Sequence, residues 1–270
     1  MSLLGVSTYG HYITTCGRSD GRVYIYCETS NNGWVHDNTL YCDSQVTSVS
    51  LKGRNLITGC RDGDCVLWNR RDDSQVTTYQ HYESSAILSD DMTKVAFGTP
   101  EDTIRIHDIT TGQLLTTLLG HSGYISSIKW DRDGRSLVSG SHDRTVKTWS
   151  LNDNNQIFSV SHQDLVMSVE LSISEQKIYA ASGNTIITWD TYSRNISNIL
   201  PTDDIVTSIS TDPTDNNQFS FGLDNGMVNV VSRVGNVSTL NRHQDSICAV
   251  IYRENGDIIA GSYDGHVHVR

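Results

Sequence analysis

Short segments in which hydrophobic and polar residues alternate recur along the whole chain, separated by turns rich in Gly, Asp and Asn. Residues 139–149, SGSHDRTVKTW, are an example, because Val146 and Thr148 alternate with Lys147 and Trp149 after the turn. A period of two predicts a strand that buries one face, and two such runs around a tight turn predict a hairpin. The pattern therefore predicts an all-β protein.

The hairpin pattern occurs seven times in register. Each copy has a small residue before a turn position and a β-forming or apolar residue after it, and the turn positions are Asp20, Asp62, Glu101, Asp143, Gly183, Asn225 and Asp264. Successive turn positions lie 39 to 42 residues apart. An alternating strand precedes most of the hairpins and another separates successive units, so one period contains four strands. Four strands in about 40 residues are typical of one blade of a β-propeller.

The repeat predicts a single seven-bladed propeller domain over residues 1–270. The blades are expected at residues 1–41, 42–80, 81–120, 121–161, 162–201, 202–242 and 243–270. The seventh blade has residues for three strands, so we expect an incompletely closed ring with an open edge along residues 265–270. An open edge can pair with a strand of a partner or of a second copy; alternatively, the sequence is a fragment or a short variant.

The charge balance argues against two classes of partner. The chain carries 31 acidic and 20 basic residues, which gives a net charge of -11, and it contains no block of Lys and Arg. Nucleic acid and anionic membrane surfaces would both be repelled by this charge. The N-terminus does not resemble a signal peptide and no apolar run is long enough to span a membrane, so we expect a cytoplasmic or nuclear protein. The six cysteines are then expected to be mostly reduced thiols.

The run from Gly120 to Trp149, GHSGYISSIKWDRDGRSLVSGSHDRTVKTW, resembles a complete WD repeat, and weaker matches cover essentially the whole chain. The resemblance implies that His121, Ser139, Asp143 and Trp149 form a buried hydrogen-bond network. The adjacent residues Ser141, His142 and Asp143, which together have the composition of a hydrolase triad, are then explained by architecture rather than catalysis, because a triad is defined by geometry and not by adjacency.

The resemblance also implies that partners dock on the narrow face of the ring, on residues just before each turn acid and around the start of each innermost strand. Carried over to this sequence, the predicted partner-binding residues are Arg61, Tyr124, Ser126, His142, Leu165, Met167, Asp224 and Tyr263. They combine apolar anchors with a few charges, as peptide-binding surfaces do. We therefore expect a non-enzymatic scaffold or adaptor that binds a protein or peptide, as a monomer within a larger complex.

Two other functions are weighed. The segment Trp68-Asn69-Arg70-Arg71 resembles the Trp-Asp-x-Arg motif of substrate receptors of cullin-type ubiquitin ligases, with Asn in place of the acid. An enzyme that uses the central channel as a pocket would need converging acid, base or metal-binding residues, and the repeats offer no such set. Neither a metal nor a cofactor is expected, since Asp264, His266 and His268 lie on a terminal edge strand without a fourth ligand.

Overall fold

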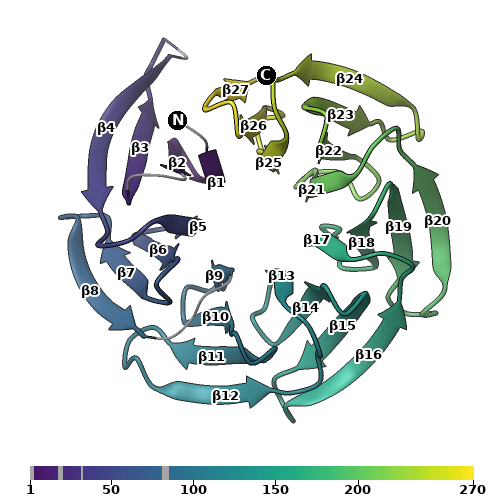
Figure 1. Cartoon of the computed structure of the whole chain (residues 1–270), viewed down its shortest axis with the longest axis horizontal. Coiled ribbons are helices and arrows are strands. Elements are labelled where there is room, and N and C mark those ends of the chain that lie inside the picture. Colours follow the sequence, from purple (N-terminus) through teal and green to yellow (C-terminus); the bar gives the residue numbers. More distant parts are fainter. Residues whose placement is uncertain (1–2, 18–20, 32, 81–84) are drawn as a thin grey trace.

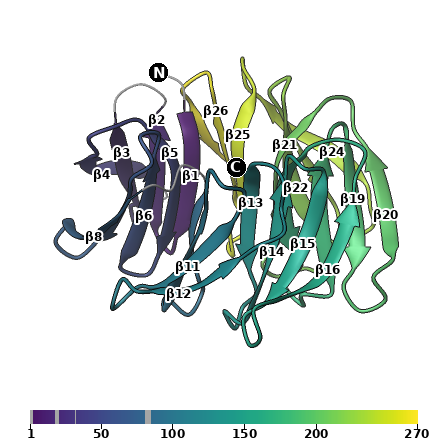
Figure 2. The ribbon, with the colours of Figure 1, turned by 60° about the horizontal axis from the view of Figure 1, so that its bottom comes forward.

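The computed structural model describes residues 3–17, 21–31, 33–80 and 85–270, and these residues form 27 strands and no helix. The strands form seven antiparallel sheets arranged in a ring (Figure 1). In the tilted view of Figure 2 the innermost strands run along the axis of the ring. This confirms the predicted seven-bladed propeller. Within the described residues there is no helix that could cross a membrane.

In each complete blade the strands follow chain order from the central channel outward. Blade 1 contains β1 (Leu3–Tyr9), β2 (Tyr12–Gly17), β3 (Arg22–Glu28) and β4 (Trp34–Tyr41). Blade 2 contains β5 (Val46–Lys52), β6 (Asn55–Cys60), β7 (Cys65–Asn69) and β8 (Ser74–Tyr79). Blade 3 contains β9 (Ala86–Leu88), β10 (Lys94–Gly98), β11 (Ile104–Asp108) and β12 (Leu114–Leu118). Blade 4 contains β13 (Ile125–Trp130), β14 (Ser136–Ser141), β15 (Thr145–Ser150) and β16 (Asn155–Ser161).

The last three blades continue the same order. Blade 5 contains β17 (Val166–Leu171), β18 (Lys177–Ser182), β19 (Thr185–Asp190) and β20 (Ile196–Pro201). Blade 6 contains β21 (Val206–Thr211), β22 (Phe219–Leu223), β23 (Met227–Val231) and β24 (Val237–Arg242). Blade 7 contains β25 (Ile247–Tyr252), β26 (Ile258–Ser262) and β27 (Val267–Val269). The turn position Asp20 lies outside the described residues.

The hydrophobic core is divided among the contacts between neighbouring blades. The second strand of each blade is buried on both faces, because it lies in the middle of its sheet and between two other sheets. The outermost strands have polar, exposed faces. Trp149 packs in a cluster with Leu118 of blade 3 and Ile125 of blade 4. Each blade therefore depends on its neighbours for burial, as expected for a repeat protein.

Blade 7 has three strands, as predicted, and no strand among the described residues pairs with the outer edge of β27. The ring is nevertheless continuous between blades 7 and 1. Ile259 of blade 7 packs in one cluster with Val6 and Ile13 of blade 1, and Trp34 packs against this cluster. Side-chain packing, rather than a strand shared between the two ends, joins the first and last blades.

Candidate functional site

Four buried side chains of blade 4 form a continuous hydrogen-bond chain. The Trp149 Nε1–H donates to Ser139 Oγ over 2.9 Å, and Ser139 Oγ lies 2.7 Å from His121 Nε2. His121 Nδ1 lies 2.7 Å from Asp143 Oδ2. Burial raises the pKa of Asp143, but hydrogen bonds from Thr145, His121 and the Ser122 amide outweigh this and lower it to about 2. The carboxylate therefore accepts from His121 Nδ1–H, and Ser139 O–H donates to the neutral Nε2.

This chain of groups has the order of a hydrolase triad but no access to a substrate. Ser139 is fully buried and its oxygen already accepts the Trp149 hydrogen bond. The sequence neighbours Ser141 and His142 do not join it, because Ser141 Oγ donates to the Gly123 carbonyl over 2.8 Å and the His142 ring packs against Tyr124. The arrangement holds the β14–β15 turn against the segment that leads into β13.

The innermost strands all begin at one end of the ring, which we call the start face, and finish at the other, which we call the end face. Because the strands of a blade are antiparallel, the turn between the second and third strands also lies on the start face. One hydrogen bond fixes this arrangement in four blades. The amide of the residue before the turn position donates to a carbonyl just before the innermost strand, in the pairs Arg61–Gln45, His142–Tyr124, Asp224–Ile205 and Tyr263–Ser246.

All eight residues predicted to bind a partner lie at this start face or at its opening into the channel. Tyr124 and Leu165 expose 46% and 42% of their surface, and the adjacent Ile205 exposes 45%. The Tyr124 and His142 rings lie 5.1 Å apart. Arg61 donates from Nη1 to Gln45 Oε1 over 3.2 Å, and Asp224 is exposed. Three large apolar side chains are thus displayed on consecutive blades, with charged residues beside them.

Ser126 and Met167 are less available. Both lie at a bulge near the start of the innermost strand, where pairing skips one residue in six of the blades. Ser126 Oγ donates toward the Gly140 carbonyl of its own blade and the Val166 carbonyl of the next. Its hydroxyl therefore links two blades, and Met167 is half-buried. Tyr263 is also half-buried.

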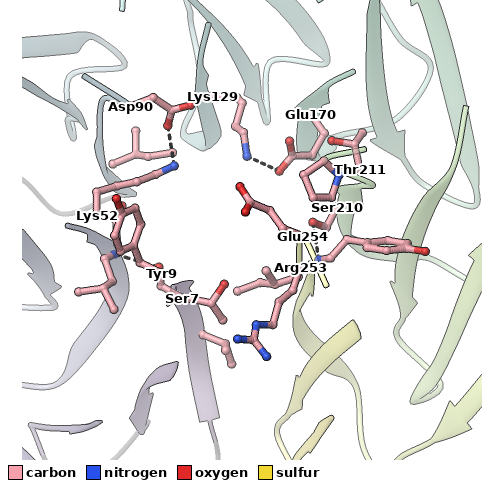
Figure 3. A pocket seen from close by; sticks show the side chains of 18 of the residues that line it. Ser7, Tyr9, Lys52, Asp90, Lys129, Glu170, Ser210, Thr211, Arg253 and Glu254 are labelled. Carbon is pink, nitrogen blue, oxygen red and sulfur yellow. Dashed lines mark hydrogen bonds and ion pairs between the residues drawn. The ribbon is translucent and has the colours of Figure 1, made fainter. Parts of the chain in front are cut away.

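The innermost strands enclose a central channel of about 1240 Å³, whose lining extends to the end face (Figure 3). Charged residues lie where several innermost strands finish, and they pair across blade boundaries. Lys52 Nζ lies 2.5 Å from Asp90, and Lys129 Nζ lies 2.8 Å from Glu170. These channel charges were not among the predicted site residues, although a charged residue near the end of β5, β13 and β17 is the signal that could have indicated them.

These pairs keep the channel groups in their charged states. Burial lowers the pKa of Lys129, but the neighbouring Glu170 carboxylate and Asp90 more than reverse this and raise it. A hydrogen bond from Arg253 lowers the pKa of Glu28, despite the opposing effect of burial. A general acid or base works best with a pKa near the operating pH. The ion pairs described here instead raise the pKa of Lys129 and lower that of Glu28, which moves both values away from neutral pH.

The two remaining motifs form contacts within the chain. Arg70 of the Trp-Asn-Arg-Arg segment is 91% buried, forms ion pairs with Asp37 and Asp73, and lies 5.5 Å from the Tyr12 ring centroid. His266 approaches Asp264, whereas His268 stacks on His243 with ring centroids 4.2 Å apart. Among the described residues, no group of three His, Cys, Asp or Glu side chains is placed to hold a metal ion.

Blade 5 keeps the His and Trp of the network but lacks their partners. The β18–β19 register places Ala180 where blade 4 has Ser139, and the short Gly183–Asn184 turn contains no acid. Both ring nitrogens of His162 and the Trp189 Nε1 are buried without a hydrogen-bond partner among the described residues. Burial lowers the pKa of His162 from 6.5 to about 4. The protonated imidazole is therefore strongly disfavoured in the folded state.

This predicts a loss of stability in mild acid. The folded-state pKa lies below the unfolded value, so the stabilisation is complete above pH 6.5 and falls as the unfolded chain gains a proton between pH 6.5 and 4. The shift corresponds to about 3 kcal/mol of unfolding free energy. Urea unfolding at several pH values would measure the unfolding free energy of the wild type and of His162→Phe. Between pH 6.5 and 4 this free energy should fall more steeply with decreasing pH in the wild type than in His162→Phe, and parallel curves for the two proteins would contradict the prediction.

Three WD repeats in this chain match the family model for the WD domain, G-beta repeat, at residues 35–69, 112–150 and 235–269. The chain is 34% identical over 151 residues to DENN domain and WD repeat-containing protein SCD1 of Arabidopsis thaliana, an alignment covering 54% of the chain and 12% of that protein. It is 25% identical over 191 residues to Protein FIZZY-RELATED 3 of the same plant, covering 66% of the chain and 39% of that protein.

A third relative is MST50-interacting protein 11 of Pyricularia oryzae, 28% identical over 87 residues that cover 32% of the chain and 28% of that protein. The alignments thus span well under half the length of each of these relatives. The matched repeats coincide with strands of blades 1 to 4, 6 and 7 of the ring. The chain thus contains three segments that match the WD repeat, and it folds as a seven-bladed β-propeller.

Proposed function

We propose that this chain is a non-enzymatic interaction scaffold that binds a protein or peptide segment on its start face, as a monomer within a larger complex in the cytoplasm or nucleus. The observation that carries the proposal is the display of Tyr124, Leu165 and Ile205, each more than 40% exposed, on three consecutive blades around one opening of the channel. Clustered apolar and aromatic side chains supply most of the binding energy at protein interfaces.

The two ends of the ring differ in the chemistry they offer. On the end face, the charges around the channel are paired with neighbouring blades, so a ligand would have to replace contacts that already exist. On the start face, exposed apolar side chains lie beside Arg61 and Asp224, which can orient a polar or charged partner. One relative is named for its interaction with MST50, which also favours a binding role for the family.

Substitution of the two anchors tests this function. The double variant Tyr124→Ala/Leu165→Ala should lose at least about tenfold in affinity for a partner, since truncation of interface anchors costs more than about 1 kcal/mol each. Its unfolding free energy should change little, because both side chains are substantially exposed. Partners would be isolated by affinity purification, identified, produced as pure proteins and measured by titration calorimetry.

A matched control variant truncates similarly exposed apolar residues on the outermost strands. Leu114→Ala/Ile199→Ala removes side chains that are 51% and 55% exposed but lie away from the start face. The control should bind the purified partner as the wild type does. Equal binding by the wild type and both double variants would exclude the start face as the binding surface.

A further inference from the structure

Blade 2 contains a thiol version of the network described in blade 4. Thr58 occupies the register position of Ser139 and accepts the Trp68 Nε1–H over 3.0 Å, as Ser139 accepts Trp149. Cys42 stands four residues before β5, as His121 stands four residues before β13. The Cys42 Sγ lies 3.6 Å from Thr58 Oγ1. The sulfur thus takes the place that the imidazole Nε2 has in blade 4.

A second thiol faces the first. Cys60 has the register position of Ser141, whose hydroxyl donates to Gly123 in the segment that leads into β13. A side chain at this position therefore faces the corresponding segment of blade 2, and Cys42 packs against the buried cluster that contains Cys60. Cys60 is 2% exposed, whereas Cys42 is half-buried. Cys42 is therefore the more accessible residue of the pair.

We propose that Cys42 and Cys60 are an oxidisable dithiol that a peroxide converts into a disulfide. The two residues already pack together at facing positions, and a disulfide requires their sulfurs to approach to about 2.05 Å. Cys42 lies in a segment outside the regular strands, which lets its side chain move toward Cys60. Metal binding is not the alternative, because Cys42, Cys60 and the nearby Cys65 do not form a metal-binding cluster among the described residues.

The two thiols differ in the way this reaction requires. The hydrogen bond from Cys60 lowers the pKa of Cys42, and Thr58 adds to this, while burial and two aspartates oppose it. The same hydrogen bond, with burial, raises the pKa of Cys60 far above its usual range. The thiolate is the reactive form of cysteine. Cys42 is also the more exposed of the two residues, so it is the group that meets and attacks the peroxide, and Cys60 is the group that resolves the product.

The reaction balances without a further cofactor. The Cys42 thiolate attacks one peroxide oxygen, the O–O bond breaks, and the departing hydroxide takes up a proton to form water, which leaves a sulfenic acid on Cys42. The Cys60 thiol then loses its proton as its sulfur attacks the Cys42 sulfur, and the S–O bond breaks with release of a second water. The two thiols lose two electrons and the peroxide gains them.

The disulfide would join the segment before β5 to the end of β6, beside the predicted partner-binding residue Arg61. Arg61 follows Cys60, and its amide and guanidinium both contact Gln45 of the same segment. The Cys42 amide, in turn, donates to the Gly21 carbonyl of blade 1 over 2.8 Å. Oxidation is therefore expected to change how Arg61 is presented on the start face, a consequence that rests on the proposed function.

Peptide mapping of the intact chain tests the chemistry directly. The reduced protein would be treated with hydrogen peroxide, alkylated without reduction and digested with trypsin, which cuts the sequence into residues 23–52, 55–61 and 62–70 around these cysteines. The expected product joins residues 23–52 to 55–61, with fragment ions that place the bond on Cys42 rather than Cys27. A bond between residues 55–61 and 62–70, or oxidised Cys42 without any bond, would overturn the proposal.

Two single variants sharpen the result. Cys60→Ser should reduce the cross-linked product at least about tenfold and leave a sulfenic acid on Cys42 that dimedone labels, because no second thiol resolves it. Cys65→Ser removes a fully buried thiol from the same hairpin and should leave the Cys42–Cys60 bond unchanged. If Cys60→Ser does not fold, the map of the wild type still decides the question, since it requires no variant.

Binding is measured separately from bond formation. Oxidised wild type should bind a start-face partner more weakly than reduced wild type, and peroxide should leave the affinity of Cys60→Ser unchanged. A cross-link without any change in affinity would refute the effect on Arg61 but not the dithiol. Absence of any partner dependent on Tyr124 and Leu165 would instead refute the proposed function, while the peptide map remained interpretable.

Discussion

Asp143→Ala is expected to lower the unfolding free energy by about 4 kcal/mol, because it leaves several buried hydrogen-bond donors without their acceptor and each such donor costs about 1–3 kcal/mol. The carboxylate accepts hydrogen bonds from the His121 ring and from the amides of Ser122 and Thr145. The His121 and Asp143 side chains are only 1% and 5% exposed, so water cannot fully replace the lost acceptor. Guanidinium unfolding monitored by tryptophan fluorescence would measure the change.

Blade 7 provides the matched control. Asp264 makes similar contacts, accepting from His243 Nδ1 over 3.1 Å and from the Gln244 and His266 amides. The chain of hydrogen bonds stops there, because Ala260 replaces the serine, Arg270 replaces the tryptophan, and His243 Nε2 has no partner in the described part of the chain. Asp264→Ala should therefore cost about half as much. Equal losses for both variants would show that the complete network adds nothing to the pair.

The fold could be predicted from the sequence because it depends on local patterns. A turn residue at a fixed place between two alternating runs defines a hairpin, and seven hairpins at one period define the ring. The buried network in blade 4 was implied by resemblance and needs only that His121, Ser139, Asp143 and Trp149 occupy their usual places. The effect of missing network partners could not be predicted, since the burial of His162 without a partner among the residues that the structure describes depends on which side chains surround it in space.

The candidate site could be predicted from the sequence only in part, because local patterns place some of its residues but not the contacts between blades. The start face follows from strand order, so the position of Tyr124 and Leu165 could be predicted, whereas the second hydrogen bond of Ser126 depends on the neighbouring blade. Pairs such as Lys129 with Glu170 link residues 41 positions apart, and the contact between Arg253 and Glu28 spans 225. Alternation along a strand does not specify which charges meet across blades.

Arg253→Met is expected to lower the unfolding free energy by about 4 kcal/mol, because it removes the buried cation of a largely buried ion pair. The Arg253 side chain is 8% exposed and donates to the Glu28 carboxylate over 3.0 Å and to the Gly10 carbonyl over 2.8 Å, both in blade 1. It also pairs with Asp257 at 3.1 Å and lies 5.1 Å from the Trp34 ring centroid. One guanidinium thus makes most of the polar contacts described between the last blade and the first.

In Arg253→Met we expect the boundary between blades 7 and 1 to open before the whole ring unfolds. No strand among the described residues joins blades 7 and 1, so opening of the ring at this boundary is opposed by the Arg253 contacts and the small cluster around Ile259. Hydrogen exchange in Arg253→Met should therefore accelerate first in β1, β2 and β26, while β14 and β15 of blade 4 keep their protection. Arg253→Lys, which keeps the charge but not the forked geometry, should fall between the two. Arg233→Met, which removes a 78% exposed partner of Asp215, should change stability by less than about 0.5 kcal/mol. Uniform acceleration in all blades would mean that the ring opens as one unit and that the boundary is no weaker than the others.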